Sequence, residues 1–471
     1  MPQKILFVTG RLAEHSLRST LAPLADSIGF DFSIQVMPIT VAALMTPNWI
    51  AKHLDIPSGT TRIILPGYCD GDLQPIRDVT DLPLTTGPKD LRDLPRLFGQ
   101  QKIPPSLEQW TIEIIAEINH APRLTRTQIT QMAQSYAADG ADWIDIGCEP
   151  NRQWTDVADT VKAVRDLGLS VSIDSLNPKE IEPAVQAGAG LVLSVNKTNR
   201  EAAKDWGVPV VVIPDQIDQL DSMECTLEVL SKAGVPLRID PILEPIGLGF
   251  AASLERYLAA RRRWPDAEMM MGIGNLTELT DVDSAGVNFL LLGICQELNI
   301  QSVLTTQVIN WARSSVKECD LARRLVYYAV HQQAPPKNLS NDLVSLRDSR
   351  LVHFTANQLE DLAKQIKDNN YRIFAQDGEI HLLGSGHHLH DRDPFVVFDQ
   401  LAQTQPTNLT PSHAFYLGYE MSKAMTALTL EKQYTQDESL DWGHLTEHEK
   451  NRHRLQKRFR SSERNPKKTP P

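Results

Sequence analysis

Eight strand-like apolar runs alternate with eight helical stretches between about residues 107 and 332, and this alternation constrains the fold more than any other feature. The strand-like runs are 112–118, 143–148, 170–175, 190–196, 209–214, 237–240, 268–275 and 302–308. The helical stretches lie near 127–138, 154–167, 178–187, 200–206, 219–233, 248–263, 283–298 and 315–330. Eight β/α units within roughly 225 residues are typical of a (β/α)8 TIM barrel, whereas a doubly wound sheet usually stops near six strands. The predicted fold class is therefore α/β with a central barrel over 107–332.

The segments on either side of the predicted barrel differ from it in character. Strand and helix also alternate in residues 1–106, which predicts an N-terminal Rossmann-like α/β domain with a small parallel sheet. Residues 333–436 open with the Pro/Asn-rich APPKNLSNDL and predict a small α+β domain, with a hairpin in YRIFAQDGEIHLLG and a helix over 413–430. Residues 437–471 are expected to form a basic, disordered tail.

Finer features are expected within the N-terminal domain. Its strands are expected at 4–10, 32–37 and 62–65, and its helices at 12–28 and 39–54. The segments PGYCDGDLQP and TTGPKDLRDLP are dense in Pro, Gly and Asp, so loops are expected there.

Composition excludes several classes of protein. Hydrophobic residues make up 41% and charged residues 23% of the chain, which are globular values. No apolar window reaches the roughly 18 residues of a membrane span, and the N-terminal run is too short for a signal peptide. The five cysteines form no CxxC pair, which favours a reducing cytoplasm. Because the net charge is −12 and the basic residues of 450–471 leave the rest more acidic still, no nucleic-acid partner is expected.

Polar side chains gather at the carboxyl ends of the predicted barrel strands, where such barrels hold their active sites. They are Asn119, Asp145, Glu149, Asp174, Ser175, Ser194, Asn196, Asp215, Asp240, Asn275, Thr305 and Thr306. Buried carboxylates are costly unless donors face them, and the 2-amino-4-oxopyrimidine edge of a pterin offers one carboxylate two N–H groups. The pattern therefore predicts a pterin site. Metal ions are the competing functional interpretation, and a single Asp can also cap a helix.

Four motifs in chain order resemble the pterin-binding barrel family of dihydropteroate synthases and methyltetrahydropterin-dependent methyltransferases. They are ADGADWIDIGCEP at 138–150, VSIDS at 171–175 followed by AVQAGAGLVLSVN, RIDPILEPIGLGF at 238–250, and MMGIGN at 270–275. The whole chain is similar to a longer subgroup, the dihydropteroate synthase-related proteins of tetrahydromethanopterin-making organisms, which carry an extra domain on each side of the barrel. The resemblance implies a reduced pterin as ligand, with the pterin-binding residues Asp174, Asp240, Asn196, Asp145 and Asn275.

Two cationic positions of the synthases are not basic in this sequence. Leu276 stands where the resemblance implies a Lys, and Leu304-Thr305-Thr306 stands where it implies an Arg–His pair. A pterin diphosphate needs positive charge around it. The candidates for that charge are Lys197, Arg152 and Arg313, or Mg²⁺ held partly by Asn119. Lys197 and Asn275 are also the candidate catalytic residues.

Three functions follow from the resemblance. The first is a transferase that condenses a hydroxymethyl-dihydropterin diphosphate with an arylamine, such as 4-aminobenzoate or its ribosyl derivative, in tetrahydromethanopterin- or folate-type biosynthesis. The second is methyl transfer from a methyl-tetrahydropterin, with Asn275 at the reacting nitrogen. The third is a pterin-binding module without chemistry of its own. The expected partners are the pterin and the arylamine, with a homodimer as a further expectation.

The His-rich stretch HLLGSGHHLHDRD at 381–393 lies outside the predicted barrel. His387, His388 and His390 are candidate ligands of a transition metal. The alternative interpretation is a loop after the predicted hairpin, with exposed histidines. Cys148, at the end of the second barrel strand, has no neighbouring His to activate it and is expected to be a small strand-end residue rather than a nucleophile.

Overall fold

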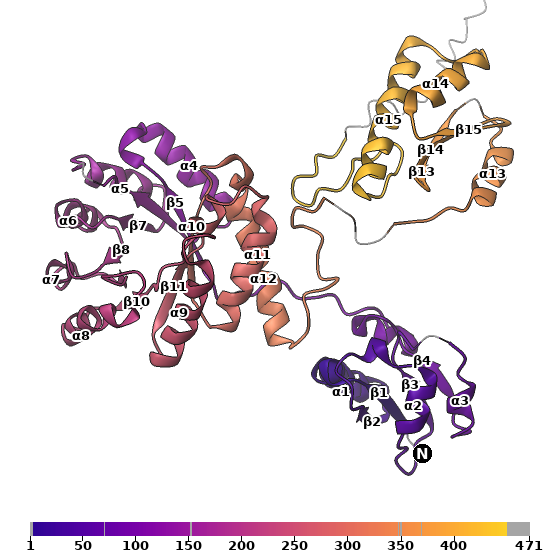
Figure 1. Cartoon of the computed structure of the whole chain (residues 1–471), viewed down its shortest axis with the longest axis horizontal. Coiled ribbons are helices and arrows are strands. Elements are labelled where there is room, and N and C mark those ends of the chain that lie inside the picture. The colour runs from indigo at the N-terminus through magenta and orange to yellow at the C-terminus, as the bar shows by residue number, and fades with distance from the viewer. Residues whose placement is uncertain are drawn as a thin grey trace, which may run out of the picture. The chain divides into compact units, whose positions relative to one another are not determined.

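The computed structural model describes residues 3–69, 71–150, 153–346, 348, 351–368 and 370–449. The chain divides into two compact units, the first ending at Ser340 and the second beginning at Asn341 (Figure 1). A four-stranded sheet and a closed eight-stranded barrel lie in the first unit, and a three-stranded sheet lies in the second. The predicted fold class is confirmed, and the finer division at residues 106 and 332 stays a prediction.

The N-terminal sheet is parallel, with strand order β2-β1-β3-β4. The strands are β1 (Lys4–Thr9), β2 (Asp31–Val36), β3 (Arg62–Leu65) and β4 (Leu84–Thr86), and the main helices are α1 (Glu14–Ile28) and α2 (Pro47–His53), with a short α3 (Gln74–Arg77). Leu17 and Leu21 of α1 pack on Ile5 and Phe7, while Ile50 of α2 packs with the oppositely directed Leu6. Each face of the sheet is therefore buried under helix, which suits a parallel sheet.

Two expectations for this domain were wrong in detail. The helix expected over 39–54 begins only at Pro47, because the Thr46 side chain accepts the backbone N–H of Trp49 and caps the helix there. Residues 85 and 86, expected to lie in a loop, belong to strand β4 beside β3. A strand of three residues between Pro- and Gly-rich segments leaves almost no periodic pattern to detect.

Eight parallel strands close the barrel. They are β5 (Glu113–Ile118), β6 (Trp143–Gly147), β7 (Val171–Asp174), β8 (Leu191–Val195), β9 (Val210–Val212), β10 (Leu237–Ile239), β11 (Glu268–Gly272) and β12 (Ser302–Thr306). The helices are α4 (Arg126–Ala138), α5 (Val157–Arg165), α6 (Pro178–Ala187), α7 (Arg200–Ala203), α8 (Glu224–Lys232), α9 (Phe250–Arg263), α10 (Gly274–Thr277), α11 (Ser284–Glu297) and α12 (Ser315–His331). Pairing of β12 with β5 completes the ring.

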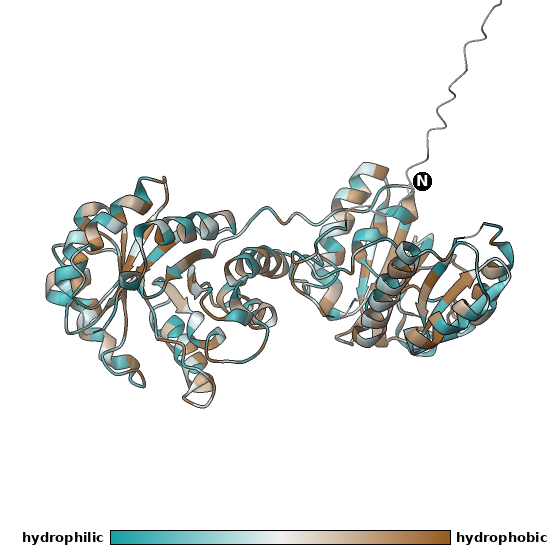
Figure 2. Ribbon diagram, turned by 90° about the horizontal axis from the view of Figure 1, so that it is seen from above, coloured by the Kyte–Doolittle hydropathy of each residue, from teal (hydrophilic) through white to brown (hydrophobic). Residues whose placement is uncertain are grey.

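Alternation along each strand sends every second side chain into the barrel. On β5, Ile114, Ala116 and Ile118 join the core under the helices, whereas Ile115 joins a separate apolar cluster inside the barrel. In Figure 2 the barrel strands are largely brown and the helices carry most of the teal. The members of the inner cluster are Ile115, Trp143, Leu191, Leu193, Leu304, Val211 and Met270. The next inward position of β5 after Ile115 is Glu117, so a polar layer follows the apolar one toward the carboxyl ends of the strands.

Helix α12 is locked to the opposite, N-terminal side of the barrel by Arg323. This side chain is 2% exposed and donates to the carbonyl oxygens of Ile112 and Gly140. It also pairs with Asp142 at 2.5 Å and with Asp320 at 2.8 Å. A buried arginine with its donors used in this way fixes the last helix against the first two strands.

The second unit is an antiparallel sheet with helices on both faces. Its elements are α13 (Ala356–Gln365), β13 (Arg372–Gln376), β14 (Glu379–Gly384), β15 (His387–Asp391), α14 (Pro394–Gln403) and α15 (Pro411–Leu430). Asp377 and Gly378 join β13 to β14 with φ values of 50° and 83°, as a tight two-residue turn requires, so the predicted hairpin is confirmed. The loop expected across the His-rich stretch is wrong, because residues 387–391 form a third strand paired with β14.

Among the described residues, no helix has both the length and the apolar character that crossing a membrane requires.

Candidate functional site

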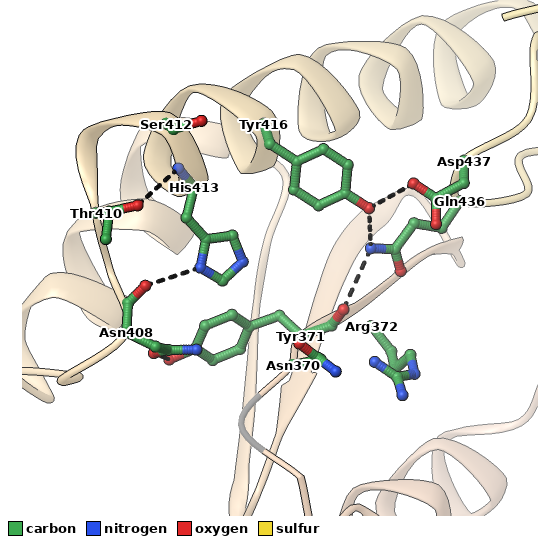
Figure 3. A pocket seen from close by; sticks show the side chains of 10 residues that line it. All are labelled: Asn370, Tyr371, Arg372, Asn408, Thr410, Ser412, His413, Tyr416, Gln436 and Asp437. Atoms are coloured by element: carbon green, nitrogen blue, oxygen red, sulfur yellow. Dashed lines mark hydrogen bonds between the residues drawn. The ribbon is translucent and has the colours of Figure 1, made fainter. Parts of the chain in front are cut away.

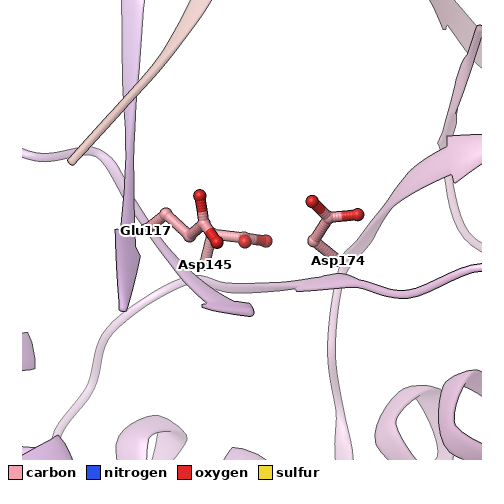
Figure 4. A group of neighbouring side chains, drawn as sticks. All are labelled: Glu117, Asp145 and Asp174. Atoms are coloured by element: carbon pink, nitrogen blue, oxygen red, sulfur yellow. The ribbon is translucent and has the colours of Figure 1, made fainter. Parts of the chain in front are cut away.

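Four acidic side chains lie at the carboxyl ends of barrel strands. Glu117 lies near the end of β5, Asp145 lies in β6, Asp174 ends β7 and Asp240 follows β10. Glu117 is the register partner of Asp145, and Gly147 is the partner of Asp174. One oxygen from each of Glu117, Asp145 and Asp174 lies within 4.8 Å of the others (Figure 4). We call these four acidic residues the acid layer.

Sequence reasoning missed Glu117. A prediction based on the residue that ends each strand overlooks Glu117, which stands before the last residue of β5. A usable signal was present, because a Glu two residues after the inward-facing Ile115 must also face inward. Asp174 ends β7 and Asp240 directly follows β10, as the sequence indicated, whereas Asp145 lies in the middle of β6.

Burial raises the pKa of every member of the acid layer above its usual range. The pKa of Glu117 is raised to about 8 by burial, and the charges of Asp174 and Glu278 add to the effect. Burial likewise raises the pKa of Asp145 well above its usual range, and Asp174 and Glu117 raise it further. Burial also raises the pKa of Asp174, although a hydrogen bond from Ser194 opposes the shift. Among the described residues, no ion pair joins a member of this layer to a basic side chain.

Asp240 is better supplied with donors than its neighbours. Oδ1 accepts the Tyr257 hydroxyl at 2.5 Å and the backbone N–H of Ile242 at 2.8 Å. Ile242 has a φ of 65°, an outlier for a β-branched residue, and this conformation accompanies the N–H contact to Asp240. Burial still raises the pKa of Asp240, to about 6, against the lowering effect of these hydrogen bonds. Asp240 is therefore mostly ionised at pH 7.

Asn275 lies close to Asp240, across Gly272. A Cβ on Gly272 would lie 3.5 Å from Nδ2 of Asn275 and 3.8 Å from Oδ2 of Asp240. Nδ2 of Asn275 donates to the carbonyl of Leu243 at 3.1 Å, which fixes the orientation of the amide. Asn196, in contrast, uses its side-chain oxygen within its own loop, where Oδ1 accepts the backbone N–H of Thr198 at 2.9 Å. The amide of Asn275 is thus fixed beside the acid layer, and the Asn196 oxygen serves its loop.

The predicted cationic residues are not gathered at the acid layer. Lys197 is exposed and its backbone N–H is bonded to Asp215, and Arg313 is also exposed. Arg152 lies outside the described residues. Asn119 accepts the hydroxyl of Thr306 at the end of β12. Among the described residues, no contact joins Lys197 or Arg313 to the acid layer. The cationic diphosphate site therefore stays a prediction.

Two basic side chains that sequence reasoning missed lie in the loop after β5. Arg123 forms an ion pair with Glu149, and Nδ1 of His120 lies 3.3 Å from the same carboxylate. Leu276, where a synthase lysine was expected, is 4% exposed in α10 and belongs to the barrel core. Arg123 therefore places one positive charge in the first βα loop, paired with Glu149.

Cys148 follows β6 at the barrel mouth. Burial raises the pKa of its thiol, and neighbouring carboxylates raise it further. The thiol is therefore protonated at neutral pH, which agrees with the expectation that it is no nucleophile.

The C-terminal unit holds a cavity of about 640 Å³ beside Tyr371, His413 and Tyr416 (Figure 3). Its polar side chains bind one another. Gln436 donates to the Tyr416 hydroxyl at 2.8 Å, and that hydroxyl donates to Asp437 at 2.8 Å. We therefore place the candidate site at the acid layer, where a buried carboxylate oxygen of Asp145 has no such partner among the described residues.

Strand β15 brings together a set of histidines that differs from the predicted set of metal ligands. His387 is exposed, and its ring bonds the carbonyl of Ser385. His388 and His390 lie on the opposite face of β15, where they meet His381 with ring centroids 5.3 Å from it. Within the described segments, the three-ligand grouping that could hold a metal is the one of Glu117, Asp145 and Asp174. Metal binding by the histidines stays a prediction.

Comparisons with known proteins agree with the barrel and its motifs. Residues 122–233 match a family described as pterin binding enzyme, and residues 3–89 match a family of unknown function (DUF6513). The first match covers 122–233, within the barrel, and agrees with the predicted resemblance to pterin-binding enzymes. It includes Asp145 and Asp174.

Curated and solved relatives were also found. An uncharacterized protein of Methanocaldococcus jannaschii is 26% identical over 521 residues, spanning 92% of this chain and 98% of that protein. A Yersinia pestis dihydropteroate synthase with a pterin–sulfa conjugate is 20% identical, with a TM-score of 0.39, over 48% of this chain and 95% of its own. A Thermus thermophilus dihydropteroate synthase with 4-aminobenzoate is 20% identical, with a TM-score of 0.36, over 47% of this chain and 95% of its own.

Proposed function

We propose that this chain is a pterin-dependent transferase that holds a reduced pterin by Asp174 and Asp240. The observation that carries the proposal is the acid layer itself, inside a barrel whose family binds pterins. Buried carboxylates facing one another are unfavourable unless a ligand brings donors to them. The exocyclic amine and adjacent ring N–H of a pterin are such donors, matched in spacing to one carboxylate.

Each residue receives a role from its environment. Asp240, with a pKa of about 6, is ionised and supplies the bidentate acceptor for the amine and ring N–H. Asp174 accepts the remaining ring donors. Asn275, whose NH₂ is bonded to Leu243, turns its amide oxygen toward the ligand. Asp145 lies beside Asp174, with one oxygen of each within 4.8 Å.

The proposed reaction is displacement at the pterin methylene. The arylamine nitrogen forms a bond to that carbon while the carbon–oxygen bond to diphosphate breaks, and the nitrogen then loses a proton. The departing diphosphate needs cations near it. Arg123 of the first βα loop is a further candidate. It joins Lys197, Arg152, Arg313 and Mg²⁺, the sources named from the sequence. Condensation with an arylamine is thus the main proposal.

Methyl transfer is the second candidate, and one observation favours it. Asn275 is fixed beside Asp240 by its hydrogen bond to Leu243, as a group acting on a reacting ring nitrogen has to be. An acid-rich mouth also suits a ligand without diphosphate better than one with it. Under this proposal the methyl group passes from the ring nitrogen to a reduced corrinoid carried by a separate protein, and the nitrogen takes up a proton.

The test is binding followed by turnover. Full-length protein is titrated calorimetrically with 6-hydroxymethyl-7,8-dihydropterin, and then assayed with its diphosphate plus 4-aminobenzoate. Saturable binding with product formation supports condensation. Binding without product, combined with demethylation of a methyl-tetrahydropterin, supports the second candidate. Binding with neither reaction indicates a pterin-binding module, and the absence of binding contradicts the proposal.

A further inference from the structure

We propose that Glu117, Asp145 and Asp174 form a binding site for a hard divalent cation, Mg²⁺ or Mn²⁺, on the floor of the barrel mouth. This site differs from the Asn119 region considered for diphosphate. It shares Asp174 and Asp145 with the predicted pterin contacts, and a test with the metal ion alone allows the two proposals to fail separately.

The geometry brings one oxygen from each side chain together. The residues belong to three consecutive strands, β5, β6 and β7, and an oxygen of each lies within 4.8 Å of the other two. Glu117 and Asp145 are register partners, so their carboxyl groups extend from neighbouring backbones into the same interior space. Figure 4 shows the Asp145 carboxyl between those of Glu117 and Asp174. Three carboxylates facing one point from rigid strands form a preorganised ligand set.

A second observation points to an occupant. Asp145 is fully buried, with 0% exposure, and its Oδ1 accepts the Ser172 hydroxyl at 2.6 Å. Its other oxygen, Oδ2, is buried and has no hydrogen-bond partner among the described residues. An unpartnered carboxylate oxygen in such a place costs free energy that a bound cation recovers. Asp145 therefore needs a ligand of positive charge on its Oδ2 side.

The backbone also makes room for the Glu117 carboxyl. A Cβ on Gly147 would collide with Oε1 of Glu117 and would come within 3.2 Å of the carbonyl oxygen of Ile118. Any larger residue at 147 would push the Glu117 carboxyl away from Asp145 and Asp174. The glycine at this position thus keeps the three ligands together.

The chemistry of the donor set selects the cation. All three ligands are carboxylate oxygens, without sulfur or imidazole, which suits Mg²⁺ and Mn²⁺ rather than zinc or copper. Asp240 and Glu278 add further negative charge nearby. A cation in the site would allow the neighbouring carboxyl groups to ionise together, which they otherwise resist because of burial and mutual repulsion.

The experiment measures Mn²⁺ binding without any pterin. Full-length protein is stripped with EDTA, exchanged into metal-free buffer at pH 7.5, and titrated with MnCl₂ while free Mn²⁺ is followed by electron paramagnetic resonance. MgCl₂ competition then tests whether both ions share the site. The variants are Glu117→Gln and Asp145→Asn, and the matched control is Glu278→Gln, which neutralises a nearby acid outside the ligand set. Thermal melts in EDTA verify that each variant is folded.

We expect one saturable site with a dissociation constant at or below about 1 mM, displaced by Mg²⁺. Glu117→Gln and Asp145→Asn should each weaken binding by at least about tenfold, whereas Glu278→Gln should change it by less than about threefold. Absence of saturable binding, or equal affinity of folded Glu117→Gln and wild type, overturns the site. Because no pterin is present, failure here leaves the pterin proposal untouched, and failure of pterin binding leaves this site untouched.

Discussion

The hydroxyl of Tyr257, in helix α9, donates a hydrogen bond of 2.5 Å to Oδ1 of Asp240 at the end of β10. Both side chains are buried, so the phenol is a fixed donor that favours the ionised carboxylate. Burial still leaves the pKa of Asp240 at about 6. Tyr257 therefore orients Asp240 and favours its ionised form.

Tyr257→Phe should raise the pH at which pterin binding is lost. If pterin binds the carboxylate form of Asp240, as proposed, wild-type affinity should fall as the pH decreases through about 6. Removing the phenol removes a stabilising donor, raises the pKa of Asp240, and moves this fall toward neutral pH. Dissociation constants measured from pH 5 to 8 check it. An unchanged midpoint in a folded variant would show that Asp240 does not control binding.

Glu117→Gln should reduce the loss of stability as the pH rises. The pKa of Glu117 is about 8 in the folded protein and near 4.5 when exposed, so between these values the folded state holds an extra proton. Wild-type stability should then fall with increasing pH, by up to about 1.4 kcal/mol per pH unit for one proton. Urea unfolding in EDTA at pH 5.5 and 7.5 measures the slope. The same slope in both proteins would contradict the raised pKa of Glu117.

Arg323→Met should destabilise the barrel strongly. The change removes the 2%-exposed guanidinium that pairs with both Asp142 and Asp320. The expected loss in the free energy of unfolding is about 3–5 kcal/mol. Arg324→Met is the matched control, because Arg324 pairs with the same Asp320 but is 26% exposed, and about 1 kcal/mol is expected there. Chemical denaturation followed by circular dichroism compares them. Equal losses of stability in the two variants would mean that the burial of Arg323 does not increase its contribution to stability.

Asn275→Ala separates the two proposed reactions. If Asn275 acts on the reacting nitrogen in methyl transfer, the rate should fall by about 10²–10³-fold. If it only lines the pocket for condensation, binding should weaken by about 1 kcal/mol with little further effect. Binding and turnover are measured on the same preparation. A variant indistinguishable from wild type in both would remove Asn275 from the site.

The barrel could be predicted from sequence because its elements are long and periodic. The strand at 143–148 and the helix at 178–187 are bounded by clear signals, such as Asn177-Pro178 at a helix start, and the structure places β6 and α6 there. The loops above the barrel carry no such period. The ion pair of Arg123 with Glu149 joins two loops far apart in sequence, so only the closed barrel reveals it.

The C-terminal unit shows where local patterns are insufficient. The turn Asp377-Gly378 identifies its own hairpin, because both residues readily adopt positive φ. Strand β15 reads HHLHD, which lacks the apolar alternation of a buried strand, and it exists because β14 offers an edge to pair with. Tertiary pairing, rather than local preference, therefore decides which face each histidine occupies.

Titration of the full-length protein with 6-hydroxymethyl-7,8-dihydropterin, in wild type and Asp174→Asn, tests the central claim most directly. The account predicts saturable wild-type binding that weakens by about 2–4 kcal/mol in Asp174→Asn, because a buried charged acceptor is lost. Asp166→Asn, an exposed change at the end of α5, is the control and should bind as wild type does. No binding to the wild type, or equal affinity in a folded Asp174→Asn, would contradict the assignment of the barrel mouth as the pterin site.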